Sequence, residues 1–358
     1  MSKLALICGD PAGIGPEIIA AWLAARSGTG SQSVSGMGVP PMGLIAPAVF
    51  PENTGETPVP RHNSIHGRDA HATQTASLAA QADAVAVIGP ASWLASLPDD
   101  VEKIAVGPAD YEAILGTPDD TGSRVALAAM ELAATGCREG RFSGVVTGPV
   151  SKARLAAVGY PFPGQTEFFA DRWGGDPVMA FCGGRLRVVL LSWHIPLREV
   201  PTQLTPAHFA RTVQAADALA RAEGVAHPRI AVCGLNPHAG EDGLLGSEEL
   251  TIIDPILDGL RGKFPGLSRT LPGDTVFARQ LKGEFDVVVA LYHDQGLAPL
   301  KTVDFDESVN VTLGLPFVRT SPDHGTAYGI AGKSVSSSTS FTNAVRVAQR
   351  LITRRLER

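Results

Sequence analysis

The sequence predicts an α/β fold built on a layered, mainly parallel sheet. Short apolar runs typical of buried strands alternate along the chain with longer amphipathic segments typical of helices. Three of the apolar runs also share an ending, because His194, His238 and His293 each stand at the end of one. With 358 residues, of which 44% are hydrophobic, the chain can bury a large core.

The chain begins with a strand, a glycine-rich loop and a helix. Residues 4–8 are an apolar run, residues 9–15 contain three Gly, and residues 16–25 start with the proline favoured in a first helical turn. The loop resembles a dinucleotide fingerprint in position but lacks the full GxGxxG pattern. A standard Rossmann domain is therefore not expected.

The next segment, from about residue 27 to residue 82, has a different composition. It contains seven Gly and six Pro and almost no periodic apolar pattern. We therefore predict that residues 27–82 are a low-complexity loop inserted into a single domain that spans residues 1–358.

Regular alternation of strands and helices resumes after this insertion. We expect strands at residues 83–88 and 142–146, in addition to the three that end in histidine. The predicted helices are residues 124–134, capped near Thr121, and residues 206–222, 248–261 and 341–356. Because helices separate the histidine-ending strands, those strands should be parallel.

The three strand-end histidines are the strongest chemical signal. Ligands of open α/β sheets bind outside the carboxyl ends of the strands, so three imidazoles could meet in one crevice. Three His ligands with an open position form a common catalytic metal site. The alternative is that each His is a hydrogen-bonded structural residue. The HExxH spacing of zincin proteases does not occur.

Polar residues around this predicted crevice indicate an anionic ligand. Lys301 follows His293, and Asn310 and Arg319 flank the run of residues 311–318. Lys and Arg near a metal need an anionic partner such as phosphate or carboxylate, although a solvated surface is the alternative. Gln165 and Thr166 add amide and hydroxyl groups suited to orienting a polar ligand.

Composition excludes several other classes of function. The net charge of -6 comes from 36 acidic and 30 basic residues that are well mixed, so nucleic acid is not an expected partner. The four cysteines lack CxxC spacing and are expected to be buried and unpaired. Residues 4–8 are too short an apolar run for a signal peptide or a membrane span, which predicts a cytoplasmic protein without a membrane partner.

Five motifs then narrow the expectation to a family. They are GDPAGIGPE at residues 9–17, TGPV at 147–150, GLNPHAGE at 234–241, YHDQG at 292–296 and LGLPFVRTS at 313–321. Together, and in this order, they resemble the 4-hydroxythreonine-4-phosphate dehydrogenase family of pyridoxal phosphate biosynthesis. The resemblance covers about 300 residues, all of the chain except the insertion.

The resemblance implies a fold similar to that of isocitrate and isopropylmalate dehydrogenases, with two interleaved subdomains around a central cleft. It implies a homodimer in which His194, His238 and His293 bind a divalent metal (Zn, Mg, Mn or Co) and one of the three comes from the partner subunit. The substrate contacts that it implies are Thr166, Lys301, Asn310 and Arg319. The family usually has His where this chain has Gln165, which leaves the exact substrate open.

The resemblance also implies NAD or NADP as cofactor. Residues 323–327, followed by Ile330 to Lys333, look like the adenosine-binding loop of those dehydrogenases, although a simple Gly-rich turn is the alternative. The cofactor contacts expected from this loop are His324, Gly325, Thr326 and Ala327. Asp274 is the candidate for proton relay or for orienting a metal-bound group, with a helix N-cap as an equal alternative.

The implied reaction is the oxidation of 4-phosphohydroxy-L-threonine to 2-amino-3-oxo-4-(phosphohydroxy)butanoate, followed by decarboxylation to 3-amino-2-oxopropyl phosphate. Relatives that oxidise four-carbon sugar-acid phosphates or a cyclohexadiene dihydrodiol share the scaffold, so they are alternatives. The alternative from another class is a zinc-dependent hydrolase that needs no dinucleotide.

Overall fold

A single mixed sheet organises the structure, a computed structural model that describes residues 3–26 and 84–356. Within these residues, 11 strands are arranged in the order β3-β2-β1-β4-β11-β10-β5-β6-β9-β7-β8. The strands are β1 (Leu4–Ile7), β2 (Val85–Gly89), β3 (Glu102–Ala105), β4 (Gly144–Thr147), β5 (Val178–Cys182), β6 (Val188–Leu190), β7 (Ile230–Cys233), β8 (Leu267–Leu271), β9 (Val287–Ala290), β10 (Val309–Leu313) and β11 (Val318–Pro322). The predicted insertion at residues 27–82 lies outside the described residues.

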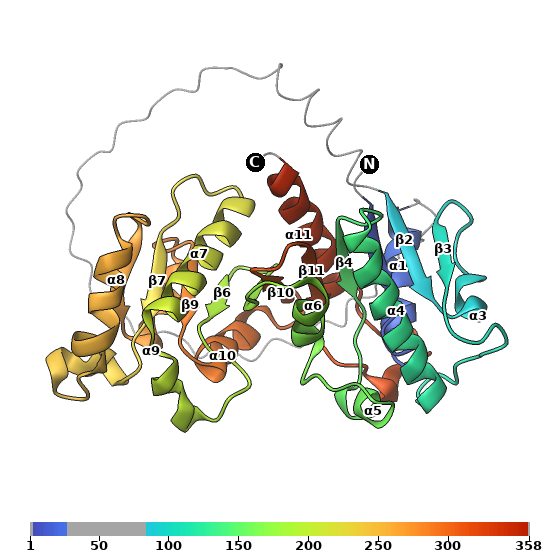
Figure 1. Ribbon diagram of the computed structural model, residues 1–358, viewed down its shortest axis with the longest axis horizontal. Helices are drawn as coiled ribbons and strands as arrows, with labels where there is room; N and C mark the ends of the chain where they lie inside the picture. The colour runs from blue at the N-terminus through green and yellow to red at the C-terminus, as the bar shows by residue number, and fades with distance from the viewer. Residues whose placement is uncertain (1–2, 27–83, 357–358) are drawn as a thin grey trace, which may run out of the picture.

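The pairings of the described strands are parallel except for three that involve β5 or β10. This confirms the predicted mainly parallel α/β class. The exception is a late hairpin, β10–β11, which lies in the middle of the sheet between β4 and β5 (Figure 1). The strands before residue 150 therefore form one end of the sheet, and β5 to β9 form the other.

Helices cover both faces of this sheet. They are α1 (Gly15–Arg26), α3 (Ala91–Leu94), α4 (Asp120–Arg138), α5 (Lys152–Ala157), α6 (Gln165–Trp173), α7 (Pro206–Ala222), α8 (Asp254–Leu260), α9 (Gly273–Leu281), α10 (His293–Asp304) and α11 (Thr339–Leu356), with the short segments η1 (Leu197–Gln203), η2 (Pro237–Gly243) and η4 (Tyr328–Ile330) and the π-helix η3 (Glu249–Ile253). The prediction for residues 206–222 agrees with α7, which begins after the N-cap Thr205.

Two helix predictions need correction. The helix expected at residues 124–134 is longer, and its N-cap is Asp119 rather than a residue near Thr121, because the Asp119 carboxylate accepts a hydrogen bond from the Gly122 N–H. The helix expected at residues 248–261 divides into η3 and α8, which begins with an aspartate followed by a proline. Proline lacks the N–H that a continuous helix would use at this point.

Alternation along the strands divides the core between the two faces. In β1, Leu4 and Leu6 belong to a hydrophobic cluster that extends along one face of the whole sheet, under α1, α7, α8 and α11. Ala5 and Ile7 belong to a second cluster on the opposite face, which includes residues of α4 and α6. A third cluster contains Val188 and residues of α9 and α10.

The opposite face is polar between the second and third clusters. In β10, Val309, Val311 and Leu313 belong to the cluster of the first face, so Asn310 and Thr312 point to the other side. In β11 the same alternation places Arg319 beside them, paired across the hairpin with Thr312. A gap in the apolar surface therefore coincides with three polar side chains in the middle of the sheet.

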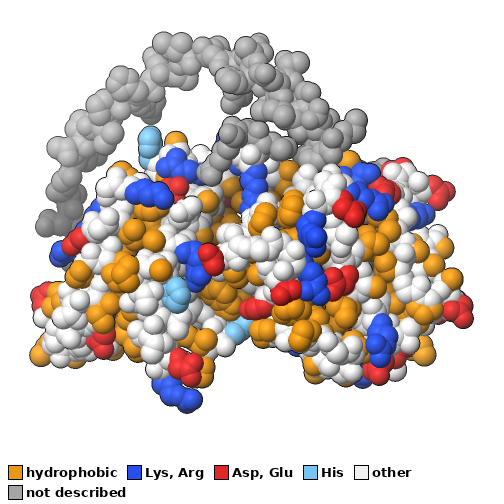
Figure 2. Space-filling model, in the orientation of Figure 1, with side chains coloured by type: hydrophobic (Ala, Val, Ile, Leu, Met, Phe, Trp, Pro, Cys, Tyr) orange, Lys and Arg blue, Asp and Glu red, His pale blue; other side chains and the backbone are white. Residues whose placement is uncertain are grey.

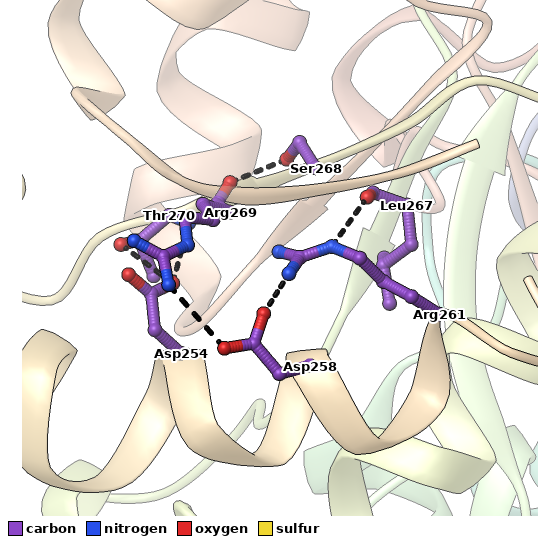
Figure 3. Close-up of polar contacts among 7 residues, drawn as sticks. All are labelled: Asp254, Asp258, Arg261, Leu267, Ser268, Arg269 and Thr270. Carbon is purple, nitrogen blue, oxygen red and sulfur yellow. Dashed lines mark hydrogen bonds and ion pairs between the residues drawn. The ribbon is translucent and has the colours of Figure 1, made fainter. Parts of the chain in front are cut away.

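At the far end of the sheet, polar contacts hold α8 against β8 (Figure 3). The buried Asp254 carboxylate accepts hydrogen bonds from the Thr270 N–H at 2.9 Å and from its hydroxyl at 3.1 Å. One turn later Asp258 pairs with both Arg261 and Arg269. The side chains of the segment that follows η3 thus bind both the backbone and the side chains of β8.

Charged side chains of both signs lie on the surface (Figure 2), and the cysteines are buried. Figure 2 shows Lys and Arg side chains interspersed with Asp and Glu over the face in view. All four cysteines are buried and unpaired, as predicted. None of the helices that the structure describes is long and apolar enough to cross a membrane.

Candidate active site

The polar gap in the sheet opens into a cavity of about 260 Å³. The loop after β6, the hairpin β10–β11 and helices α6 and α10 all contribute to its walls. It brings together eight of the residues predicted from the sequence: Gln165, Thr166, His194, His293, Lys301, Asn310, Arg319 and His324. A larger groove of about 1060 Å³ between α7 and α11 contains none of them.

Arg319 is the buried cation of the cavity, with only 4% of its surface exposed. Its guanidinium donates hydrogen bonds to Asn310 at 2.9 Å, to Thr312 at 3.4 Å and to Thr147 at 2.8 Å, all of them neutral groups. Its buried Nε has no hydrogen-bond partner. Burial lowers the pKa of Arg319 to about 10, so the side chain is still cationic at neutral pH. Among the described residues no carboxylate is hydrogen-bonded to this guanidinium, although that of Glu167 attracts it from a greater distance. A buried cation of this kind is suited to an anionic ligand.

Lys301 adds a second cation, which one acid neutralises in part. Its ammonium lies 3.2 Å from the Asp323 carboxylate. Burial raises the pKa of Asp323, and the attraction of Lys301 offsets part of that shift. The hydroxyl of Thr166 lies 3.2 Å from that of Thr312, next to the Arg319 contact. These side chains form a polar wall suited to phosphate or carboxylate.

Gln165 is the first residue of α6 and lines the same cavity. Its amide nitrogen donates to the Gly148 carbonyl at 3.3 Å, in the loop after β4. Its Oε1 is buried and has no partner in the described structure. The Gln165 amide is therefore held through its nitrogen, and its oxygen can still accept a hydrogen bond from a ligand.

His194 and His293 lie side by side, as expected from the strands that precede them. β6 and β9 are parallel neighbours, and the two imidazole centroids are 5.9 Å apart. Both strands are shorter than predicted, so His194 follows the end of β6 by four residues and His293 begins α10. His293 Nδ1 lies 2.7 Å from the Asp294 carboxylate, which leaves Nε2 as its other nitrogen for a metal.

Burial lowers the pKa of His194 below its ordinary value of 6.5, and the nearby Lys152 ammonium lowers it further. The neutral imidazole is the form that binds metals. We therefore expect the His194 ring of the metal-free protein to titrate below pH 6.5 in a ¹⁵N NMR titration. The Lys152→Met variant should raise this midpoint, because it removes a like charge. A midpoint at or above 6.5 in the unmodified protein would contradict this environment.

His238 lies outside the cavity. It follows β7, the other parallel neighbour of β9, yet its side chain is 66% exposed and its Nδ1 lies 3.2 Å from the Glu241 carboxylate. Within residues 3–26 and 84–356 no three His, Cys, Asp or Glu side chains are grouped so that they could hold a metal ion. The convergence of three imidazoles inside one chain is therefore not observed, because the β7 loop turns away from the cavity.

Two of the three histidines have unusual backbones. His194 has φ of +38° and His238 has φ of +54°, in the left-handed region that residues other than Gly rarely adopt. Such conformations concentrate at functional sites, where the surrounding structure imposes them. Ala327 in the predicted cofactor loop is a third example, with φ of +46°.

The predicted cofactor loop packs against the glycine-rich loop at the start of the chain. Ile14 N–H donates to the Thr326 carbonyl at 3.0 Å, and the Tyr328 hydroxyl donates to the buried Asp10 carboxylate at 2.6 Å. A Cβ on Gly13 would lie 2.7 Å from the Thr326 carbonyl oxygen, so only Gly permits this approach. His324 has a buried Nε2 without a partner and lines the cavity.

Asp274 does not line the cavity. It is exposed in the first turn of α9, whose N-cap is Pro272, so the N-cap alternative is wrong. Helix α9 packs on η2, the segment that carries His238. Lys152 and Glu167 line the cavity but were not predicted, and Asp323 was predicted only as the first residue of the cofactor loop. Lys152 follows the TGPV motif and Glu167 follows Thr166 directly, which is the signal that could have found them.

A family model matches most of this chain. Residues 61–348 match the family described as pyridoxal phosphate biosynthetic protein PdxA. The 4-hydroxythreonine-4-phosphate dehydrogenase of Bradyrhizobium diazoefficiens is 40% identical over 355 residues, which cover 97% of this chain and 96% of that relative. The protein of the same name from Xanthomonas campestris pv. campestris is 47% identical over 240 residues, 67% of this chain and 74% of the relative.

Solved structures of similar proteins share the fold. The 4-hydroxythreonine-4-phosphate dehydrogenase of Klebsiella pneumoniae is 29% identical, with a TM-score of 0.70 over 98% of this chain and all of the other. A terephthalate 1,2-cis-dihydrodiol dehydrogenase from Burkholderia xenovorans, at 23% identity and a TM-score of 0.61 over 98% of each chain, shows the fold alone. The family resemblance of the motifs is thus confirmed, and the chain belongs to the pyridoxal phosphate biosynthetic protein PdxA family.

Proposed function

We propose that this protein is a metal- and NAD(P)-dependent dehydrogenase that oxidises 4-phosphohydroxy-L-threonine to 2-amino-3-oxo-4-(phosphohydroxy)butanoate, whose decarboxylation gives 3-amino-2-oxopropyl phosphate. The observation that carries the proposal is the cavity that joins the imidazoles of His194 and His293 to a buried Arg319, whose described hydrogen bonds all go to neutral groups. Membership of the family and relatives named for this activity support it. The hydrolase alternative has no comparable support.

In this proposal the cavity binds the substrate through its two anionic groups. Arg319 and Lys301 would hold the phosphate and carboxylate ends, because both cations line one wall. Thr166 and Asn310 would orient the substrate by hydrogen bonds from neighbouring positions on that wall. Phosphate bound at Arg319 would also place a negative charge next to the buried guanidinium, whose hydrogen-bond partners in the free protein are neutral.

The donor set of the cavity suits a divalent ion but is incomplete. His194 favours its neutral form, His293 has a carboxylate on Nδ1, and Gln165 and Glu167 each have a buried oxygen without a partner. His194 and His293, with His238 of the partner subunit, would hold zinc, magnesium, manganese or cobalt. A bound divalent ion would lower the pKa of the substrate hydroxyl and stabilise negative charge on its oxygen during oxidation and decarboxylation.

A homodimer would complete this site. His238 does not line its own cavity and is exposed, and the arm around it, from η2 to η3, exposes Leu244, Leu245, Leu250 and Ile252. Exposed apolar side chains gathered on one segment are typical of a protein interface. Asp274 lies on α9, which packs against η2, so it lies on a segment next to the one that carries His238. Asp274 remains our candidate for proton relay.

We place the nicotinamide cofactor, NAD or NADP, on the loop formed by His324, Gly325, Thr326 and Ala327. The support for this placement is that the loop continues from β11 beside the cavity and is fixed by the glycine-rich loop of residues 9–15. A bound nicotinamide would accept hydride from the substrate carbon that bears the hydroxyl group.

We also propose the cytoplasm as the compartment, in keeping with four unpaired cysteines.

The proposal is tested by assaying nicotinamide reduction with purified protein. The substrates are 4-phosphohydroxy-L-threonine, a four-carbon sugar-acid phosphate and a cyclohexadiene dihydrodiol, each with NAD and NADP and with each of the four metals. We expect turnover of the first substrate to exceed that of the others. Failure to reduce either nucleotide with any substrate and metal would overturn the dehydrogenase proposal.

The substitution Gln165→His tests whether this position sets the choice among substrates. Gln165 can accept a hydrogen bond but cannot carry a proton, whereas His can do both. We expect the ratio of kcat/KM for 4-phosphohydroxy-L-threonine to that for the sugar-acid phosphate to rise at least about tenfold, or about 1.4 kcal/mol. Gln214→His, on an exposed position of α7, is the control. An unchanged ratio would show that Gln165 does not determine specificity.

A further inference from the structure

The turn that carries His238 has a rare backbone conformation. Its five residues, 238 to 242, have φ values of 54°, 54°, 83°, 44° and 52°, and only the third is Gly. L-amino acids other than Gly rarely enter this left-handed region, and never favour it over a run of residues. Such a run persists only where neighbouring groups impose it.

The carboxylate of Glu249, which is 1% exposed, lies at the start of this turn. One of its oxygens accepts the Asn236 backbone N–H at 2.8 Å, and the other accepts the Asn236 side-chain amide at 3.0 Å. Asn236 is the N-cap of the turn, and its carbonyl accepts the Ala239 N–H at 3.1 Å. The carboxylate therefore fixes the residue from which the left-handed turn starts.

The turn also closes around this carboxylate. A Cβ on Gly240 would lie 2.7 Å from one Glu249 oxygen, and a Cβ on Gly234 would lie 3.1 Å from the other. On the far side, η3 continues into α8, which Asp254 holds to β8 (Figure 3). Glu249 is thus attached to a fixed support and lies close both to Gly240 in the turn and to Gly234 before it.

Burying a carboxylate costs free energy unless the charged group is paired or hydrogen-bonded. Here both of its partners are N–H groups of Asn236, and they lead to the only predicted metal ligand outside the cavity. We propose that Glu249 is a positioning residue that acts through His238, holding the left-handed turn so that its imidazole is presented to the cavity of the partner subunit. This inference rests on the proposed shared metal site.

The test uses Glu249→Gln, which keeps the size of the side chain. Its amide can accept one of the two Asn236 N–H groups but places its own NH₂ against the other. We expect the dissociation constant for zinc to rise by about 10- to 100-fold, as for other residues that orient a metal ligand. Zinc affinity is measured by competition with a chelator, so the readout does not depend on turnover.

The matched control is Asp254→Asn, in the same segment. Asp254 is also a buried carboxylate that accepts a backbone N–H, but it contacts β8 rather than the turn. We expect this variant to lower thermal stability, because a charged acceptor becomes neutral. Both zinc sites of the dimer should stay at wild-type affinity, because the amide oxygen still accepts both Thr270 hydrogen bonds and so keeps the support of Glu249 in place. Where Glu249→Gln does not fold, Asn236→Ala replaces it, because it removes the side-chain amide that donates to Glu249 and Glu248 and leaves the backbone N–H in place.

Heterodimers of two different variant chains distinguish a role of Glu249 in positioning His238 from a general loss of structure. Heterodimers are purified through two different affinity tags, and tight zinc sites per dimer are counted. A Glu249→Gln chain paired with a His194→Ala chain should recover one tight site, because the intact cavity of the first receives the intact turn of the second. Paired with a His238→Ala chain it should recover none, since neither turn then supplies a positioned imidazole.

Each remaining outcome has a separate meaning. Two wild-type sites in the Glu249→Gln homodimer, or no recovery with His194→Ala, would overturn the role of Glu249. A heterodimer of His238→Ala and His194→Ala chains that recovers no site would overturn the shared metal site itself. Absence of zinc binding in the unmodified protein would overturn the metal-dependent function proposed above.

Discussion

His238→Ala is expected to abolish zinc binding and turnover while the fold remains intact. The substitution removes one of three proposed ligands. Loss of a residue that only orients a ligand lowers metal affinity by up to about 100-fold, so the zinc affinity of this variant should fall by more than that. Because the side chain is 66% exposed and its described partner is Glu241, the free energy of unfolding should change by less than about 0.5 kcal/mol.

The measurements for His238→Ala are zinc per subunit, kcat with 4-phosphohydroxy-L-threonine, and thermal unfolding in the absence of metal. His227→Ala is the matched control, since His227 is exposed and lies in the loop after α7. It should retain metal and activity. Full zinc content with full activity in His238→Ala would show that the exposed histidine is not a ligand.

Arg319→Met is expected to remove substrate affinity without weakening the free protein. Truncating one partner of a buried charged pair typically costs about 2 to 5 kcal/mol of binding. We therefore expect kcat/KM to fall by about 10²- to 10³-fold, mostly through KM. The free protein loses a buried cation that has only neutral partners, so its melting temperature should be unchanged or higher.

Arg319→Lys refines this test. It keeps the positive charge but loses the planar fork that reaches Thr147 and Asn310 together. We expect an intermediate kcat/KM, closer to that of the Met variant if geometry matters more than charge. Steady-state kinetics and calorimetry of the substrate-free protein give both quantities. A Met variant with unchanged KM would show that Arg319 does not bind the substrate.

Some elements could be predicted because their signals are local. Helix α7 has a capping Thr205, a proline in its first turn and an amphipathic pattern, and its predicted bounds agree with the structure. The run of residues 311–318 was not recognised as a hairpin. It bends at Gly314, where φ is +78° and a Cβ would lie 2.1 Å from the Asp176 carbonyl oxygen. That constraint comes from a distant segment, so no local pattern reveals it.

In the candidate site, too, some features follow from local sequence and others depend on distant segments. Histidines that follow parallel neighbouring strands were expected to meet, and His194 and His293 do so. The direction of His238 could not be predicted, because it depends on a left-handed turn and on a buried carboxylate 11 residues away in sequence. Asn310 and Arg319 were singled out because they flank one apolar run, whereas the buried state of the guanidinium required the tertiary structure.

The central position of the β10–β11 hairpin has a consequence for the order in which the protein is made. Among the described strands, β4 and β5 are joined through this hairpin alone, so the two ends of the sheet share no backbone pairing until residues 309–322 have been synthesised. The same residues carry Asn310 and Arg319. A nascent chain therefore contains all three histidines before it contains Asn310 and Arg319, and completing the sheet and completing the site become one late folding event.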